Sequence, residues 1–125
     1  MITADEMCKA LADRNRIRII AALFTHKELC ACQINEWLAV SGATASKHLS
    51  ILMRAELIIN RKDGRWVFYK IQKTNPNTRK LLSWAKHQID LDVNLQNELK
   101  DLNNVTNCSP NTIRERQRKE AALCC

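Results

Sequence analysis

The spacing of apolar residues in the first half of the chain predicts four amphipathic helices. Thr3 and Glu6 have the spacing of a capping box that opens the first helix, and Asp13 is placed to cap the second. A third helix is expected at roughly 31–39, and a fourth begins after the N-cap Ser41. The apolar stripes of these helices are expected to pack into one core, made of Met7, Leu11, Ile17, Ile20, Ala21, Phe24, Ile34, Trp37, Leu38, Ala45, Leu49, Leu52 and Met53.

Beyond the fourth helix the apolar pattern changes to that of β-strands. Residues 57–62 and 65–71 are expected to form a hairpin across Asp63-Gly64, because this pair favours a type I′ turn and the second segment is rich in strand formers. A heptad-like apolar stripe then predicts one long helix over 77–102, which carries Trp84, Leu91, Leu95 and Leu102. The expected fold class is therefore mainly α with a small β-hairpin.

Two short helices joined by the tight segment 40–43 and followed by a hairpin predict a winged helix-turn-helix. Seven Lys and Arg against two Asp and Glu give residues 40–73 a net charge of +5, whereas 1–39 and 74–102 are neutral and 103–125 carries +2 of the total of +7. A charge excess confined to one segment favours a surface for a polyanion, since each neutralised phosphate releases counterions. We therefore predict that the chain binds double-stranded DNA.

The fourth helix is the expected recognition element, because its apolar stripe leaves the opposite face open to the major groove. Small residues at its start permit close approach to base edges, whereas Lys47 and Arg54 are expected at phosphates. His48, on the flank, is expected to pack between helices or to contact a phosphate. The hairpin's basic residues surround a narrow tip that can follow the DNA backbone or enter the minor groove. The residues expected to contact DNA are Ser41, Gly42, Ala43, Thr44, Ser46, Lys47, His48, Ser50, Arg54, Arg61, Lys62 and Arg65.

Four segments of the chain, in this order and spacing, resemble the ArsR/SmtB family of winged-helix metal-sensing repressors: KALADRNRIRII, ELCACQI, SGATASKHLSILMRAELI and RKDGRWVFYKI. The resemblance runs from about Met7 to Ile71 and, more loosely, to Asn107-Cys108-Ser109. It points in particular to the arsenite-sensing repressors, which carry an E-L-C-x-C-D-L-C motif at this place. The resemblance implies a homodimer that occupies an operator and leaves it when a thiophilic ion binds.

The same resemblance implies that the first helix and the long helix 77–102 form the dimer interface. The apolar stripe of the long helix agrees with this, because a stripe outside the main core needs a surface to cover it. The chain is expected to divide into a DNA-binding and dimerisation domain at 1–102 and a Cys-containing, partly mobile tail at 103–125.

Cys30 and Cys32 are the expected metal ligands. In a regular helix their side chains would point about 200° apart, since each residue turns ~100°. However, residues 30–33 have the spacing of a capping box with Cys30 at the N-cap, so the two sulfurs can converge at the helix start. The positive end of the helix is expected to lower the pKa values of both thiols. As(III) and Sb(III) prefer sulfur, although ligand softness also admits Cd(II), Pb(II) and Zn(II).

Trivalent arsenic takes three ligands, and here the sequence departs from its relatives. The last cysteine of the resembled motif corresponds to Asn35. Either a small ligand fills the third position, or a distant cysteine completes the site; Cys108 is the first candidate and the terminal pair Cys124-Cys125 the second. Cys8 is expected to belong to the core, where relatives commonly have a bulky apolar residue.

Several function classes are disfavoured by what the sequence lacks. The N-terminus MITADEMCKA is acidic where a signal peptide would be basic, so we expect a cytoplasmic protein whose six cysteines are reduced. No apolar run approaches the roughly 18 residues of a membrane span. The sequence has no C-x-x-C motif and no glycine-rich turn that would indicate an enzyme or an organic cofactor. The prediction is thus a DNA-binding homodimeric repressor induced by As(III) or Sb(III); a Cd(II), Pb(II) or Zn(II) sensor and a thiol-based redox or persulfide sensor remain alternatives.

Overall fold

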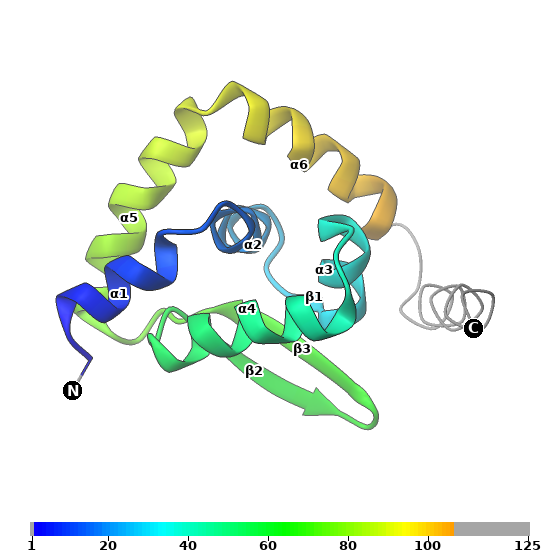
Figure 1. Cartoon of the computed structure of the whole chain (residues 1–125), viewed down its shortest axis with the longest axis horizontal. Coiled ribbons are helices and arrows are strands. Elements are labelled where there is room, and N and C mark those ends of the chain that lie inside the picture. Colours follow the sequence, from blue (N-terminus) through cyan, green and yellow to red (C-terminus); the bar gives the residue numbers. More distant parts are fainter. Residues whose placement is uncertain (1, 107–125) are drawn as a thin grey trace.

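Helix α2 runs through the middle of the fold, and the other elements pack around it (Figure 1). The computed structural model describes residues 2–106, so the predictions for Cys108, Cys124, Cys125 and the tail lie outside the described residues. In chain order the elements are α1 (Ala4–Leu11), α2 (Arg14–Thr25), β1 (Leu29–Cys30), α3 (Ala31–Leu38), α4 (Gly42–Arg54), β2 (Ile58–Asp63), β3 (Trp66–Ile71), α5 (Pro76–Leu91) and α6 (Val93–Thr106). The predicted mainly helical fold with a β-hairpin is confirmed.

The first helices begin where the sequence places their caps. The Thr3 amide donates to Glu6 Oε2 at 2.9 Å, which completes the predicted capping box. Asp13 Oδ1 accepts from the amide of Asn15 at 2.8 Å, and this side chain caps α2 as expected. Ser41 is likewise the N-cap of α4. These local signals are sufficient because a cap needs only partners two or three residues away.

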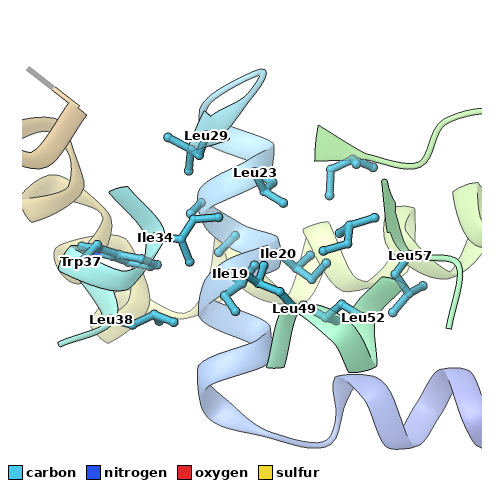
Figure 2. Close-up of a cluster of buried hydrophobic side chains, with 14 of the residues drawn as sticks. Ile19, Ile20, Leu23, Leu29, Ile34, Trp37, Leu38, Leu49, Leu52 and Leu57 are labelled. Atoms are coloured by element: carbon cyan, nitrogen blue, oxygen red, sulfur yellow. The ribbon is translucent and has the colours of Figure 1, made fainter. Parts of the chain in front are cut away.

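The core forms on both sides of α2. Every residue from Ile19 to Leu23 is buried, so the second half of α2 is enclosed by the other elements. Figure 2 shows apolar side chains of α3 on one side of this helix and those of α4 and the following segment on the other, namely Ile34, Trp37, Leu38, Leu49, Leu52 and Leu57. Burial of this apolar surface is the main force that holds α3 and α4 in place.

The hairpin closes one residue later than predicted. Asp63 pairs with Trp66, so the two loop residues are Gly64 and Arg65 rather than Asp63 and Gly64. Gly64 has a φ of +59°, whereas Arg65 does not have a positive φ. A glycine with positive φ at the first loop position is the pattern of a type II′ turn, so the predicted type I′ turn was wrong.

A third strand, β1, was not predicted. Its two residues pair antiparallel with β3, Leu29 opposite Tyr69 and Cys30 opposite Phe68, which gives the sheet order β1-β3-β2. A two-residue strand has no readable periodicity of its own, because it exists only through its partner. Its consequence is that Cys30 is joined by its backbone to the hairpin.

The predicted long helix is broken at Asp92 into α5 and α6. Asp92 Oδ1 accepts from the amide of Leu95 at 3.0 Å, and Oδ2 accepts from Arg14 Nη1 at 2.7 Å. Helix α6 then turns back over α2 and α3, as the arc across the upper part of Figure 1 shows. Leu95 and Leu102 are therefore buried within the chain, and their predicted place on a dimer stripe is wrong.

The remaining apolar residues of that stripe stay outside the core. Trp84 is 61% exposed, Leu91 is 65% exposed and Val93 is 72% exposed. None of the helices within residues 2–106 combines the length and the apolar character that crossing a bilayer requires.

Candidate DNA-contact surface and thiol site

Helix α4 presents the predicted contact face to solvent. Ala45, Leu49 and Leu52 are buried, so the helix is anchored by its apolar stripe. The small and basic residues predicted to face DNA are exposed: Ser41, Gly42, Ala43, Thr44, Ser46, Lys47, Ser50 and Arg54. This arrangement gives one face with small side chains at the helix start and cations further along, which suits insertion into a major groove.

His48 does not lie on this face. Its side chain is buried, and its Nδ1 lies 3.2 Å from Arg16 Nη1. Arg16 in turn donates through Nε to the carbonyl of Ala10 at 2.7 Å, near the end of α1. Of the two expectations for His48, packing between helices is the one the structure supports. The sequence carried this signal, because His48 follows Ala45 by three residues and so shares the buried stripe.

The wing formed by β2 and β3 extends away from the helical body (Figure 1). Arg61, Lys62 and Arg65 are all exposed on it, as predicted. Arg61 is nevertheless engaged, because Glu28 accepts two hydrogen bonds from its guanidinium, and the Phe68 ring lies 4.6 Å from it. The sequence contained no sign of this pairing, since 33 residues separate the two charged groups.

The two predicted thiol ligands meet at the start of α3. Cys30 is the N-cap, and its amide donates to Gln33 Oε1 at 2.8 Å, as the capping-box spacing predicts. The sulfurs of Cys30 and Cys32 lie 2.9 Å apart, within thiol hydrogen-bonding contact and longer than the about 2.05 Å of a disulfide. Both sulfurs therefore lie at the helix start where one soft ion can bind them together.

The pKa of the Cys32 thiol is raised, not lowered as expected. The hydrogen bond with Cys30 and partial burial both favour the protonated form, and they outweigh the opposing effect of the Gln33 and Cys32 amides. Two thiolates this close repel each other, so the pair resists losing both protons until a positive ion replaces them.

A cavity of about 230 Å³ opens beside this thiol pair. It is bounded by Cys32 and Asn35 of α3, by Ser46 and Leu49 of α4, and by Tyr69 of β3. Asn35 Oδ1 is buried and has no hydrogen-bond partner among the described residues. Within residues 2–106 no group of three or more His, Cys, Asp or Glu side chains is placed to hold a metal ion. The thiol pair thus fits two bonds to a soft ion, but a third protein ligand is not among these residues.

Cys8 lies away from the core. Its side chain is exposed on α1, so its predicted place among the buried residues was wrong. The buried position in the last turn of α1 belongs to Ala10 instead.

The comparisons with known proteins agree with this geometry. A family model described as "Bacterial regulatory protein, arsR family" matches residues 13–60. The arsenical resistance operon repressor of Escherichia coli (strain K12) is 34% identical over 85 residues, which cover 68% of this chain and 68% of that protein. The cadmium resistance transcriptional regulatory protein CadC of Listeria innocua is 41% identical over 64 residues, which cover 51% of this chain but only 54% of that protein.

A solved structure confirms the architecture. The homodimeric winged helix-turn-helix DNA-binding domain Mb0332 from Mycobacterium bovis superposes with a TM-score of 0.57 at 24% identity, over 71% of this chain and 80% of that one. At this identity the likeness establishes the fold, and the predicted winged helix-turn-helix is confirmed.

Proposed function

The chain belongs to the arsR family of bacterial regulatory proteins, and we propose that this transcriptional regulator represses as a homodimer on operator DNA and leaves the DNA when As(III) or Sb(III) binds Cys30 and Cys32. One observation carries the proposal: the two sulfurs lie 2.9 Å apart. They do so where α3 begins, next to the sheet that ends in the wing and next to the recognition helix.

The DNA-binding part of the proposal is supported by the exposed face of α4 and by the wing. Thr44 and Ser46 are assigned to base edges and Lys47 and Arg54 to phosphates, and the exposure of all four side chains on α4 supports this assignment. Lys62 and Arg65 add exposed cations at the wing. His48 is left out of this contact set because it is buried.

The dimer is supported by three exposed apolar residues, Trp84 in the middle of α5, Leu91 at its end and Val93 at the start of α6. Exposed apolar patches of this kind mark interaction surfaces. A second copy seated on this patch and on α1 would place two recognition helices about one DNA turn, ~34 Å, apart. Both half-sites are then engaged together, so a small shift of either helix weakens binding strongly.

The thiol pair is connected to both parts of the DNA-contact surface. The backbone of Cys30 pairs with Phe68 in the wing, and Cys32 borders the cavity shared with α4. A bound soft ion holds the two sulfurs in the arrangement that its bonds to them require. Residues 30–32 must accommodate that geometry, and they transmit the strain to the wing and to α4. By linkage, release requires that the ion bind the DNA-free dimer more tightly than the DNA-bound one.

The proposal is tested by titrating arsenite into the protein bound to a fluorescent duplex, which the protein has selected from a random-sequence pool. A phosphine reductant replaces thiol reductants, which would compete for arsenic. Wild type is expected to release the duplex, whereas Cys30→Ser and Cys32→Ser remain bound. Cys8→Ser is the matched control, because it removes an exposed cysteine from α1 and is expected to respond like wild type. Release that persists in both site variants overturns the proposal.

A Cd(II)-responsive repressor is the second candidate, favoured by the similarity to the regulator named for cadmium resistance. Cd(II) is also soft, but it commonly takes more ligands than the two thiols that the described residues bring together. The predicted third thiol, Cys108, lies outside the described residues. Titration with arsenite, antimonite and cadmium in the same assay decides between the two, with the lowest concentration for release identifying the inducer.

A further inference from the structure

An open groove of about 690 Å³ is lined by residues from the end of α2, the end of β3 and the first turns of α5. Its apolar lining includes Phe24 of α2, Ile71 of β3 and Leu82 of α5. Ile71 and Leu82 are buried and Phe24 is partly buried, so these side chains form an apolar floor that the fold holds in place. Binding sites for small organic molecules commonly have about 300–1,000 Å³, so the groove has room for one such molecule.

The groove is separate from the surface proposed for the dimer. Arg79, Ser83 and Lys86 line it, and their spacing of four and three residues places them on one face of α5. Trp84 and Leu91 are not among the lining residues, and their spacing of seven residues places them together on another face of the same helix. The groove and the exposed apolar patch therefore use different sides of α5.

Four cations line the groove, and no carboxylate does so among the residues that the structure describes. They are Lys73, which follows β3, and Arg79, Lys80 and Lys86 of α5, and all four are exposed. Of these four, only Lys86 has an ion pair in the described part of the chain, with Asp90 at 3.0 Å. The other three give the groove a positive charge that no ion pair among the described residues balances.

The start of α5 carries its cations against the usual preference of a helix. The N-terminal end of a helix has a partial positive charge, which favours acidic side chains in the first turn. Helix α5 has no acidic residue in its first turn, and Arg79 and Lys80 occupy its fourth and fifth positions. An anion in the groove would stabilise both the helix end and these cations.

From the apolar floor and the unbalanced cations together, we propose that the groove binds a small amphiphilic carboxylic acid, such as a medium-chain fatty acid. The apolar chain lies on Phe24, Ile71 and Leu82. The carboxylate is held at the rim, foremost by Arg79, because a guanidinium can donate to both carboxylate oxygens. Neither Cys30 nor Cys32 lines the groove, so this is a second ligand site that does not depend on the thiol pair.

Isothermal titration calorimetry of the full-length protein tests the proposal with probes that separate charge from apolar area. Decanoate has both features, decyltrimethylammonium has the same chain with the opposite charge, and acetate has the head group alone. We expect one decanoate per chain, with octanoate binding about tenfold more weakly because two fewer methylene groups are buried. The cationic amphiphile and acetate should bind much more weakly than decanoate. Equal binding of decanoate and the cationic amphiphile overturns the proposal.

Substitutions at the rim locate the site. The double variant Arg79→Gln/Lys80→Gln is expected to weaken decanoate binding about tenfold or more, and Ser83→Glu, which adds an acid to the lining, should have the same effect. Lys9→Gln/Lys100→Gln is the matched control, because both lysines are exposed and neither lines the groove. Circular dichroism verifies that each variant is folded. Decanoate affinities that are equal in the rim variants and in the control overturn the proposal.

Two other occupants of the groove give different results. If a second copy of the chain covers the groove, Arg79→Gln/Lys80→Gln raises the dimer dissociation constant in sedimentation equilibrium without any added ligand. If the two cations contact DNA, the double variant makes the log-affinity against log-salt slope shallower by about 1.8, the value for two phosphate contacts, and leaves decanoate binding unchanged. Either result overturns the proposal and leaves the response of the thiol pair to arsenite untouched.

Discussion

Glu28 and Arg61 form a two-point ion pair that ties the segment before the thiol site to the wing. Arg61 Nε donates to Glu28 Oε2 at 2.8 Å, and Arg61 Nη2 donates to Oε1 at 2.6 Å. The guanidinium also lies over the ring of Phe68, the residue that pairs with Cys30. Arg61, a wing cation proposed to contact DNA, and Cys30, a proposed metal ligand, are therefore both held against Phe68 of β3.

This pairing predicts that Glu28→Gln strengthens DNA binding. Glu28 competes with phosphate for Arg61, so loss of its charge releases one further cation to the DNA. We expect a severalfold gain in affinity and a log-affinity against log-salt slope steeper by about 0.9, the value for one additional phosphate contact. Fluorescence anisotropy across a salt series measures both. Asp90→Asn, which removes an equal charge from α5, is the control, and an equal gain in that variant would show that only net charge matters.

The Glu28–Arg61 pair also predicts that the stability of the fold depends on pH. The hydrogen bonds from Arg61 hold the pKa of Glu28 below its ordinary value of 4.5. Because the folded-state pKa is the lower one, the stabilisation is complete above pH 4.5 and is lost as the pH falls through the depressed value. An NMR titration of the Glu28 carboxyl should give a midpoint below 4.5 in the wild type, and the Arg61→Ala substitution should return that midpoint toward 4.5. Identical midpoints in the two proteins would contradict the pairing.

Lys47→Ala is expected to weaken DNA binding largely independently of sequence. As a phosphate contact, Lys47 contributes counterion release, so the salt slope should become shallower by about 0.9. Lys100→Ala is a matched control, since Lys100 is exposed on α6, away from α4 and the wing. A salt slope that changes equally in both variants would contradict the assignment of Lys47 as a phosphate contact.

Leu102→Ala is expected to destabilise the fold by about 2–5 kcal/mol, because a fully buried leucine leaves a cavity when truncated. Leu91→Ala removes the same atoms from a side chain that is 65% exposed, and its effect on folding should stay within about 0.5 kcal/mol. Urea unfolding at several protein concentrations distinguishes a folding effect from a loss of self-association, since only the latter depends on concentration. Similar losses for the two leucines would mean that α6 does not pack on its own chain.

Trp84→Ala is expected to weaken self-association by about thirtyfold or more, the effect typical of a central aromatic contact of about 2 kcal/mol. Sedimentation equilibrium gives the dissociation constant. Lys100→Ala should leave that constant unchanged. If Trp84→Ala also leaves it unchanged, the apolar patch around Trp84 is not the dimer contact.

Local patterns were sufficient for the elements whose partners are near in sequence. The caps at Thr3, Asp13 and Ser41 needed only the next two or three residues, and the convergence of Cys30 and Cys32 followed from a four-residue capping box. The hairpin was also found, although its turn was displaced by one residue, because a glycine permits more than one turn type.

Short-range periodicity and caps thus determined the elements of the fold, and the basic excess of residues 40–73 predicted DNA as the partner. Asp92 caps the amide of Leu95 locally, but tertiary structure decided its bond from Arg14, 78 residues away, and the strand β1, which exists only beside β3. It also decided the cavity behind Asn35 and the engagement of Arg61 by Glu28. The physical reason is common to all four: each depends on a side chain or strand brought close by packing, and no local pattern records which distant residue that will be.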